Sequence, residues 1–361
     1  MKGPERPVNH ALGSELRGMI LLLILAASLQ ATPAAPPSLV WRQLPPLPDK
    51  PGVAGAFAGV SGGAMLVAGG ANFPESMPWD GGKKVWCDAV FVLDHLGGQW
   101  RRAGKLPRPL GYGVSASYKN ALICVGGCDS TRHYPNTFRL RWRDGEIHIE
   151  SMPSLPIALA NMGGALVDSR LYVVCGAEGP GEQRTSNRLF CMDLDEPQPV
   201  WLELDSLPGV PRLLAAGASH AGSFYVFGGI ALDPDDNGKE RRKYLRDAFC
   251  YREGRGWSRV ADLPKAMAAG PSPAPVVGNH VLVLPGDDGS NAGYTPADKH
   301  PGFNKGILGY DMSLNCWSDA GEDPAPRATT PCVEWGGMFI VPSGEVRPGI
   351  RSAEVWCLIS P

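Results

Sequence analysis

Met65-Leu-Val-Ala-Gly69-Gly70, four apolar residues and a glycine pair, is the first of six similar stretches in the chain. The second is Leu122-Ile-Cys-Val-Gly126-Gly127. The remaining four end at Ala177, Gly229, Gly286 and Gly344. Successive copies lie 50 to 58 residues apart. Short apolar runs bounded by glycine and proline are typical of β-strands, so the sequence predicts six similar units of short strands.

Each unit has room for four strands. The first unit has one apolar segment before its glycine pair, one ending at the pair, a third at Ala89–Asp94 and a fourth opening near Trp100. Residues 36–361 shared among six units give about 54 residues each, close to the kelch repeat length. Four-stranded units repeated around a ring form a β-propeller. The predicted fold is therefore all-β, a six-bladed kelch-type β-propeller.

The sixth unit is one strand short. It ends at Pro361, just after its third strand, whereas Val40–Pro45 resembles the fourth strand of the other units. We expect this N-terminal strand to complete the last blade, because such pairing removes open sheet edges.

The charge balance argues against nucleic-acid binding. The 361 residues include 34 Lys and Arg against 36 Asp and Glu, a net charge of −2, whereas nucleic-acid binders carry a basic surface. The 46 Gly and 35 Pro, spread between short apolar runs, exclude long helices over most of the chain.

The N-terminus has the pattern of an export signal. Three basic residues precede an apolar stretch, Met19 to Leu29, and small residues follow it. A membrane span needs about 20 apolar residues, so this stretch predicts a secretory signal peptide. The expected organisation is a signal peptide with a short linker at residues 1–35 and the propeller at 36–361, in a periplasmic or secreted protein with no membrane span. An uncleaved N-terminal anchor is the alternative.

The nine cysteines are predicted to be buried thiols. Their number is odd, no Cys-x-x-Cys occurs, and most lie inside apolar runs such as Leu171–Cys175. One or two disulfides remain an alternative.

One segment stands out on the face where the loops after the glycine pairs are long. Gly344-Glu-Val-Arg-Pro-Gly-Ile-Arg351 contains a Pro-Gly turn that brings Glu345 and Arg351 to the two ends of a short loop. A carboxylate beside a guanidinium serves as an acid/base next to an anion clamp. Spacing alone favours a structural ion pair, which is the commoner arrangement.

Other motifs in the sequence are weaker indications of function. Gly59-x-Ser-x-Gly63 matches a hydrolase elbow but lies in a hairpin without the following helix. The histidines show no paired spacing for zinc. Asp287-Asp288-Gly289 is interpreted as a solvated turn rather than a calcium site.

The Glu345–Arg351 block resembles the signature of the sialic acid mutarotase (N-acetylneuraminate epimerase) family of six-bladed kelch propellers. Pro51–Gly59 with Val67–Asn72, Tyr112–Ser115 and Phe303–Lys305 support the resemblance. In the usual family order the Glu/Arg block comes before the Gly-Val-Ala-Gly block, whereas here it comes last. The chain therefore resembles a cyclically permuted branch, which a closed ring tolerates.

The resemblance implies a function and a site. Glu345 corresponds to the family's acid/base and Arg351 to its essential arginine, which would hold the carboxylate of an acidic sugar. Asn72 and Asn304 are expected to contact substrate hydroxyls, and Arg347 to face either the substrate carboxylate or solvent. The implied reaction interconverts the α and β anomers of N-acetylneuraminate and needs no metal or nucleotide cofactor. The alternatives are a mutarotase for another acidic sugar and a non-catalytic propeller that binds glycans or protein.

Overall fold

The computed structural model describes residues 37–180, 184–234 and 240–360, and these form six four-stranded antiparallel sheets. Blade 1 comprises β2 (Phe57–Ser61), β3 (Ala64–Ala68), β6 (Ala89–Leu93) and β7 (Arg101–Lys105). Blade 2 comprises β8 (Val114–Tyr118), β9 (Ala121–Val125), β10 (Thr137–Arg143) and β11 (Glu146–Met152). Blade 3 comprises β12 (Gly163–Val167), β13 (Arg170–Val174), β14 (Leu189–Asp193) and β15 (Leu202–Leu204).

The second half repeats this plan. Blade 4 comprises β16 (Ala216–His220), β17 (Ser223–Phe227), β20 (Ala248–Arg252) and β21 (Gly256–Val260). Blade 5 comprises β22 (Val276–Val277), β23 (His280–Val283), β24 (Gly306–Asp311) and β25 (Cys316–Glu322). Blade 6 comprises β26 (Val333–Trp335), β27 (Met338–Pro342), β30 (Val355–Ile359) and β1 (Val40–Leu44).

Short elements decorate the loops between the second and third strands. They are β4 (Ala71–Asn72), β5 (Val85–Trp86), β18 (Ile230–Pro234), β19 (Glu240–Tyr244), β28 (Glu345–Arg347), β29 (Ile350–Arg351) and two 3₁₀ helices, η1 (Pro78–Asp80) and η2 (Ala297–Lys299). No helix within the described ranges is long and apolar enough to cross a membrane. The predicted signal peptide lies outside the described residues.

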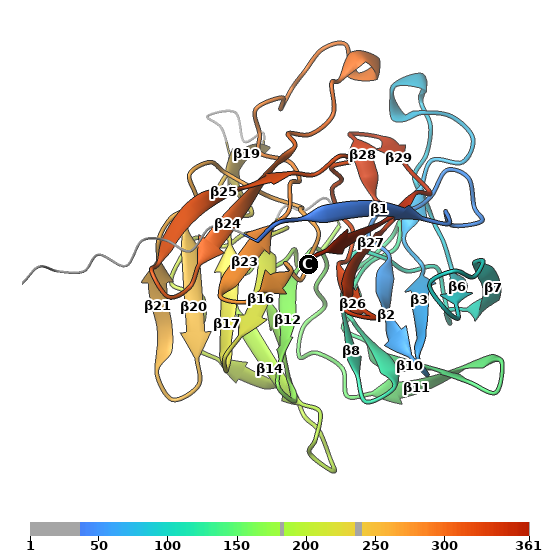
Figure 1. Cartoon of the computed structure of the whole chain (residues 1–361), viewed down its shortest axis with the longest axis horizontal. Helices are drawn as coiled ribbons and strands as arrows, with labels where there is room; N and C mark the ends of the chain where they lie inside the picture. Colours follow the sequence, from blue (N-terminus) through green and yellow to red (C-terminus); the bar gives the residue numbers. More distant parts are fainter. Residues whose placement is uncertain (1–36, 181–183, 235–239, 361) are drawn as a thin grey trace, which may run out of the picture. The chain divides into compact units, whose positions relative to one another are not determined.

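The predicted closure of the last blade is confirmed. β1 pairs antiparallel with β30 over five residues, from Val40 opposite Ile359 to Leu44 opposite Val355. Figure 1 shows the blue β1 strand beside the red strands of blade 6. The six-bladed propeller predicted from the repeats is therefore the fold observed.

A closed ring of backbone hydrogen bonds, here called the central ring, links all six blades. In each blade the residue shortly before the innermost strand has a positive φ, and its N–H donates to the carbonyl of its counterpart in the preceding blade at 2.6 to 2.8 Å. The six residues are Gly55, Tyr112, Asn161, Leu214, Ala269 and Thr329. Because Gly55 donates to Thr329, the last blade is joined to the first.

The glycine pairs provide a second set of joints between blades. In blade 1 the pair has φ values of 66° and 89°, a conformation that favours glycine, and Gly70 N–H donates to Leu110 O at 2.9 Å in the linker to blade 2. Gly344 makes the equivalent bond to Val53 O, also at 2.9 Å. In the third repeat the positive φ values fall on Cys175 and Gly176, one residue before the pair expected from the sequence.

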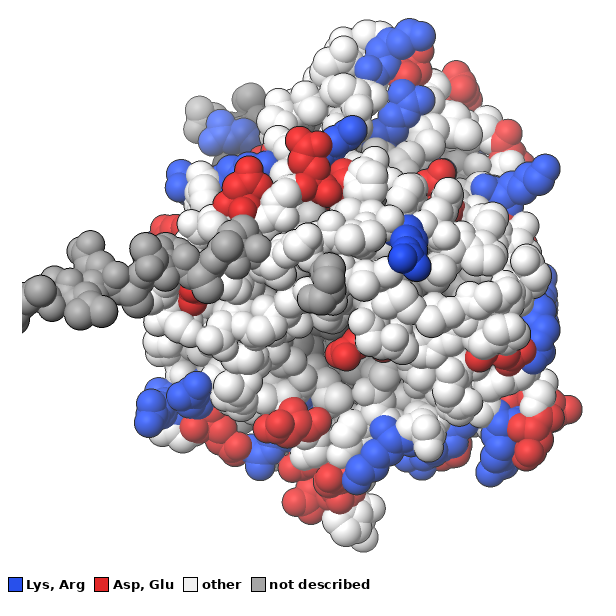
Figure 2. Space-filling model, in the orientation of Figure 1, with Lys and Arg blue, Asp and Glu red and all other residues white. Residues whose placement is uncertain are grey.

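The apolar core lies between facing blades. Leu66 of blade 1 and Leu122 of blade 2, for example, are fully buried in one cluster. All nine cysteines are thiols rather than disulfides, and six of them are buried as predicted. The prediction of burial is wrong for Cys87, Cys250 and Cys316, which are half-buried. Acidic and basic side chains are interspersed around the periphery of the face seen in Figure 2, and its middle is largely uncharged.

Candidate functional site

Glu345 occupies a position that recurs in every blade. It directly follows the Ser343-Gly344 pair, and its backbone forms a two-bond bridge with Ala328, with Glu345 N–H to Ala328 O at 3.0 Å and Ala328 N–H to Glu345 O at 2.8 Å. The equivalent residues in blades 1 to 5 are Ala71, Cys128, Ala177, Ile230 and Asp287. The repeated backbone geometry therefore fixes where the Glu345 side chain starts, beside the central ring.

The β28–β29 hairpin brings Glu345 and Arg351 together. Pro348-Gly349 forms the turn, with Gly349 at φ 85°, and Glu345 and Arg351 are cross-strand partners. Glu345 Oε1 accepts hydrogen bonds from Gly349 N–H at 2.6 Å and from Arg351 Nη1 at 3.0 Å. Among the described residues none is bonded to Oε2. One carboxylate oxygen is thus fixed by the hairpin, and the other remains for a ligand.

Arg351 is almost completely buried. Its side chain is 3% exposed and that of Glu345 is 18% exposed. The guanidinium lies 4.7 Å from the centre of the Phe73 ring, a cation–π contact. Its Nε is buried without a hydrogen-bond partner in the described part of the chain. Buried donors are normally satisfied, so the unpartnered Nε makes Arg351, a residue of the cavity lining, a candidate for binding a ligand acceptor.

The two residues share a cavity of about 280 Å³. Its lining also includes the aromatic rings of Phe73 and Phe303 and the cations Lys84 and Arg242. Further lining residues include Tyr112, Asn161, Asp287, Thr329 and Gly349. The cavity thus combines apolar rings with a small number of polar groups, as small-molecule sites do.

Asp287 occupies in blade 5 the position that Glu345 occupies in blade 6. Both oxygens of its carboxylate accept hydrogen bonds from the protein. Its Oδ2 accepts from Tyr244 Oη at 2.6 Å and its Oδ1 from Gly289 N–H at 3.0 Å. Burial and this contact with Asp287 raise the pKa of Tyr244 well above its usual range. Tyr244 therefore stays protonated and keeps donating to Asp287, which leaves Glu345 as the better candidate for proton transfer.

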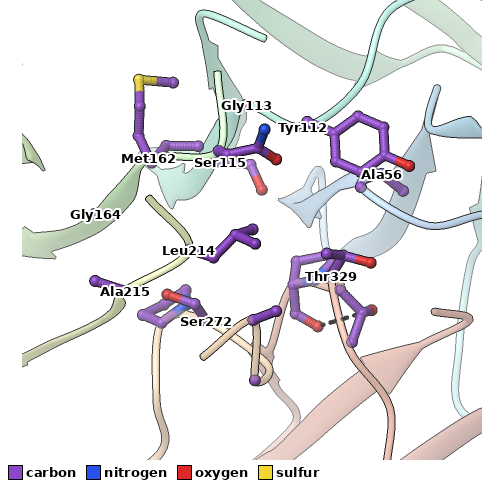
Figure 3. A pocket seen from close by; sticks show the side chains of 18 residues that line it. Ala56, Tyr112, Gly113, Ser115, Met162, Gly164, Leu214, Ala215, Ser272 and Thr329 are labelled. Atoms are coloured by element: carbon purple, nitrogen blue, oxygen red, sulfur yellow. Dashed lines mark hydrogen bonds between the residues drawn. The ribbon is translucent and has the colours of Figure 1, made fainter. Parts of the chain in front are cut away.

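The central ring forms part of the cavity lining. Tyr112, Asn161, Leu214, Ala269 and Thr329 line both this cavity and a small axial void of about 70 Å³. Figure 3 shows Tyr112, Leu214 and Thr329 around that void. Thr329 Oγ1 is buried and, in the described ranges, has no hydrogen-bond partner. Thr329 and Arg351, both lining residues, thus each carry one buried polar atom without a hydrogen-bond partner in the described ranges.

The other three predicted site residues lie outside the cavity lining. Asn72 is 7% exposed, and its Nδ2 donates to Gly52 O at 3.2 Å. Asn304 is exposed, and its Oδ1 accepts from Gly306 N–H at 3.1 Å. Arg347 Nη1 donates to the carbonyls of Asp298 at 2.9 Å and His300 at 3.3 Å. Each has a backbone partner, so contact with substrate stays a prediction for all three.

Sequence reasoning missed several cavity residues. Phe303 and Tyr112 stand inside blocks that carried the family resemblance, beside the residues that were singled out. Phe73 directly follows the predicted Asn72, whereas Lys84 and Arg242 come from long loops without a repeated pattern. In the described ranges, no group of three or more His, Cys, Asp or Glu residues is placed to hold a metal ion.

Comparison with known proteins supports the resemblance found in the sequence. Residues 26–149 match the family model of N-acetylneuraminate epimerase. A relative of that name from Yersinia enterocolitica is 40% identical over 130 residues, 31% of this chain and 32% of the relative. One from Salmonella typhi is 43% identical over 104 residues, 25% of this chain and 27% of the relative. The chain thus spans about a third of the length of the curated relatives it matches.

A solved structure extends the likeness in fold. The structure of YjhT aligns with a TM-score of 0.62 and 14% sequence identity, over 86% of this chain and 96% of that chain. The family resemblance and the propeller fold predicted from the sequence are confirmed.

Proposed function

We propose that this chain is a mutarotase that accelerates the interconversion of the α and β anomers of N-acetylneuraminate. The observation that carries the proposal is the partly buried Glu345–Arg351 pair, which lines a cavity and leaves one carboxylate oxygen and one guanidinium edge without a bond to a described residue. The names of the relatives supply the substrate, an acidic 2-keto sugar.

Glu345 is the acid/base in this reaction. Its carboxylate accepts the proton of the anomeric hydroxyl while the bond from the anomeric carbon to the ring oxygen breaks, which gives the open-chain ketone. The carboxylic acid then returns the proton to the released oxygen. Rotation about the adjacent carbon–carbon bond presents the other face of the ketone, and the reverse steps close the other anomer. One positioned acid/base typically contributes about 10²–10⁴-fold.

Arg351 holds the carboxylate of the substrate. Nη1 is bonded to Glu345, while the edge formed by Nε and Nη2 has no bond to a described residue. Side-on pairing of that edge with a carboxylate is bidentate and fixes orientation as well as position. The stack on Phe73 restrains the guanidinium, so the substrate is held at a set distance from Glu345.

The permuted order of the blocks belongs to the same proposal. A chain whose blocks are cyclically reordered aligns in one piece with only part of an unpermuted relative. The matches cover 25% to 31% of this chain, which agrees with that expectation.

The test is proton NMR of freshly released α-N-acetylneuraminate, with and without the protein. We expect the β anomer to form faster than in buffer, and Glu345→Gln to remove most of the acceleration. Equilibration no faster than in buffer would refute the mutarotase proposal for this sugar. If a binding module were the correct description, Glu345→Gln would leave affinity intact and there would be no rate to lose.

We also propose that the protein is exported, on the basis of the apolar stretch Met19–Leu29 after basic residues. Sequencing the N-terminus of protein taken from a periplasmic or secreted fraction tests this. A start near residue 35 is expected, and an intact Met1 would contradict cleavage.

A further inference from the structure

Lys84 lines the same cavity as Arg351 but comes from a loop of blade 1. β4 and β5 pair antiparallel, and Asn72 stands opposite Val85 at the end of this ribbon. Phe73 directly follows β4 and Lys84 directly precedes β5, so the two residues leave the ribbon side by side. The Phe73 ring lies 4.7 Å from the Arg351 guanidinium. The ribbon therefore places Lys84 next to the ring that restrains Arg351.

Two aromatic rings hold the Lys84 ammonium group. Its Nζ lies 5.2 Å from the centre of the Trp86 ring and 5.0 Å from that of the Tyr112 ring, both within the range of cation–π contacts. Tyr112 belongs to the central ring and lines the cavity. Within the described ranges the ammonium group makes these two contacts and no ion pair. Its charge is therefore fixed beside the cavity without a described carboxylate to neutralise it.

The other two cations of the cavity already have partners. Arg351 is bonded to Glu345. Arg242 interacts with Tyr244, which donates to the second carboxylate of the lining. The described lining residues include three cations and two carboxylates, a net charge of +1. Lys84 is the member of this set that has no acidic partner among them, so the net charge of the cavity is assigned to it.

Asp129 is the acidic residue of an adjoining cavity of about 440 Å³, which Lys84 also lines. Its carboxylate accepts hydrogen bonds from Thr131 N–H at 2.7 Å and Arg132 N–H at 3.0 Å, and it attracts the Arg132 guanidinium of the same loop. Asp129 does not line the cavity that holds Arg351. The positive charge of that lining therefore remains in place.

An acidic substrate makes this charge necessary. The proposed binding mode brings the substrate carboxylate to the Arg351 guanidinium, which Glu345 already contacts at 3.0 Å. One guanidinium then faces two carboxylates, which repel each other. A further cation beside the cavity attracts the added negative charge and offsets this repulsion. A neutral sugar brings no such charge, so the cation adds little to its binding.

We propose that Lys84 is a specificity-determining residue whose positive charge makes the cavity select acidic sugars over neutral sugars of the same shape. This inference rests on the proposed function, which supplies N-acetylneuraminate as the acidic sugar. Lys84 acts on binding through its charge and takes no part in proton transfer. An interaction made equally with the substrate and the transition state affects KM, so its effect falls mainly there.

The experiment compares N-acetylneuraminate with its methyl ester, a neutral sugar with the same ring and hydroxyl groups. Titration calorimetry gives Kd for each, and proton NMR of freshly released α-N-acetylneuraminate gives kcat and KM. Lys84→Met removes the charge and keeps most of the side-chain length, whereas Lys84→Arg keeps the charge. Lys119→Met is the matched control, because it removes the same charge from an exposed turn at the far end of β8. The five residues of that strand span about 17 Å.

We expect Lys84→Met to raise Kd and KM for N-acetylneuraminate about 3- to 10-fold, the size of one charge acting over several ångströms in a partly solvated cavity. Kd for the ester should change less than about twofold. Lys84→Arg should restore most of the affinity for the acid, and Lys119→Met should alter neither sugar. The effect of Lys84→Met should shrink from about 0.1 M to about 1 M NaCl, because the screening length falls from about 10 Å to about 3 Å. Thermal melting of each variant confirms that it is folded.

The possible results separate the two proposals. Equal losses for the acid and the ester in Lys84→Met would indicate a hydrogen bond or packing and refute charge selection, as would a Lys84→Arg variant that binds as weakly as Lys84→Met. If the wild type accelerates anomer formation and Lys84→Met binds the acid normally, the role of Lys84 is refuted and the mutarotase proposal stands. If the wild type binds the acid without acceleration and Lys84→Met weakens the acid alone, the role of Lys84 stands and the mutarotase proposal falls.

Discussion

Replacing Gly55 by alanine tests whether the Tyr112 side chain, packed on Gly55, requires a glycine at this position of the central ring. Gly55 has φ +68°, but its five counterparts, Tyr112 among them, have φ between 50° and 61° and none is glycine. Backbone conformation alone therefore does not explain the glycine. A Cβ at Gly55 would lie 2.6 Å from Cδ1 of the Tyr112 ring, closer than such contacts occur. The glycine is explained by the ring that covers it.

The structure supplies a matched control for the size of the stability loss expected in Gly55→Ala. Gly63 has φ +79°, and a Cβ there would meet nothing within 4 Å. Gly63→Ala should cost only the left-handed conformation, about 1–2 kcal/mol. Gly55→Ala adds the overpacking against Tyr112, about 1–3 kcal/mol. At about 2–4 °C per kcal/mol, Gly55→Ala should melt several degrees below Gly63→Ala.

Differential scanning calorimetry of both variants measures this difference. Because Tyr112 lines the Glu345 cavity, Gly55→Ala should also raise KM for anomer equilibration measured by proton NMR, whereas Gly63→Ala should not. A double variant with Tyr112→Ala should recover most of the extra loss of stability. Equal melting temperatures for the two glycine variants, or no recovery in the double variant, would refute the packing explanation.

The remaining predictions concern the reaction, the loops, the closure and pH. Glu345→Gln should keep Oε1 as an acceptor for Gly349 and Arg351, fold normally by circular dichroism, and lower kcat about 10²–10⁴-fold. Arg347→Gln should raise KM with kcat nearly unchanged, because it releases the loop held through the Asp298 and His300 carbonyls; a fall in kcat alone would indicate a direct role. Deletion of residues 38–45 removes β1 and should lower the melting temperature sharply; unchanged melting would count against closure. Burial raises the pKa of Cys175 to about 12 and of Tyr225 to about 12, so the folded chain holds protons that the unfolded chain releases. Stability in urea should therefore be full below about pH 8.5 and fall as pH rises toward 12; constant stability up to pH 11 would contradict this.

The fold was predictable from the sequence because the signal is local and repeated. Each blade has the same order of apolar run, small-residue pair and strand with an aromatic residue. Misplacing the pair in one copy therefore does not change the predicted number of blades. The shift to Cys175-Gly176 in the third repeat is such an error, and it moves no strand to another blade. The missing strand of blade 6 followed from the same count, and β1 fills it.

Residues of the candidate site were predictable from the sequence only where they lie next to a repeated feature of the blades. Glu345 directly follows the small-residue pair Ser343-Gly344, so the repeat fixes its position. The Pro348-Gly349 turn then predicts that Arg351 lies opposite Glu345. Strand alternation would place Arg347 on the same face as Glu345, but the register shifts between these two residues and Arg347 bonds to the neighbouring loop instead. Phe73 lies far from Arg351 in sequence, and no local pattern connects them.

Closure of the ring and construction of the site depend on the same contacts. Ser343 Oγ accepts a hydrogen bond from Val53 N–H at 2.7 Å and lies 2.7 Å from Ser352 O, and Gly344 N–H donates to Val53 O. The residues on either side of the Glu345–Arg351 hairpin are therefore fixed by a segment near the start of the chain. Asn72 braces that segment through Gly52 O. These contacts require only that the first and sixth blades be neighbours, whichever of them comes first in the chain. A cyclic reordering of the blades preserves every one of them, so the chemistry of this cavity is independent of where the polypeptide begins.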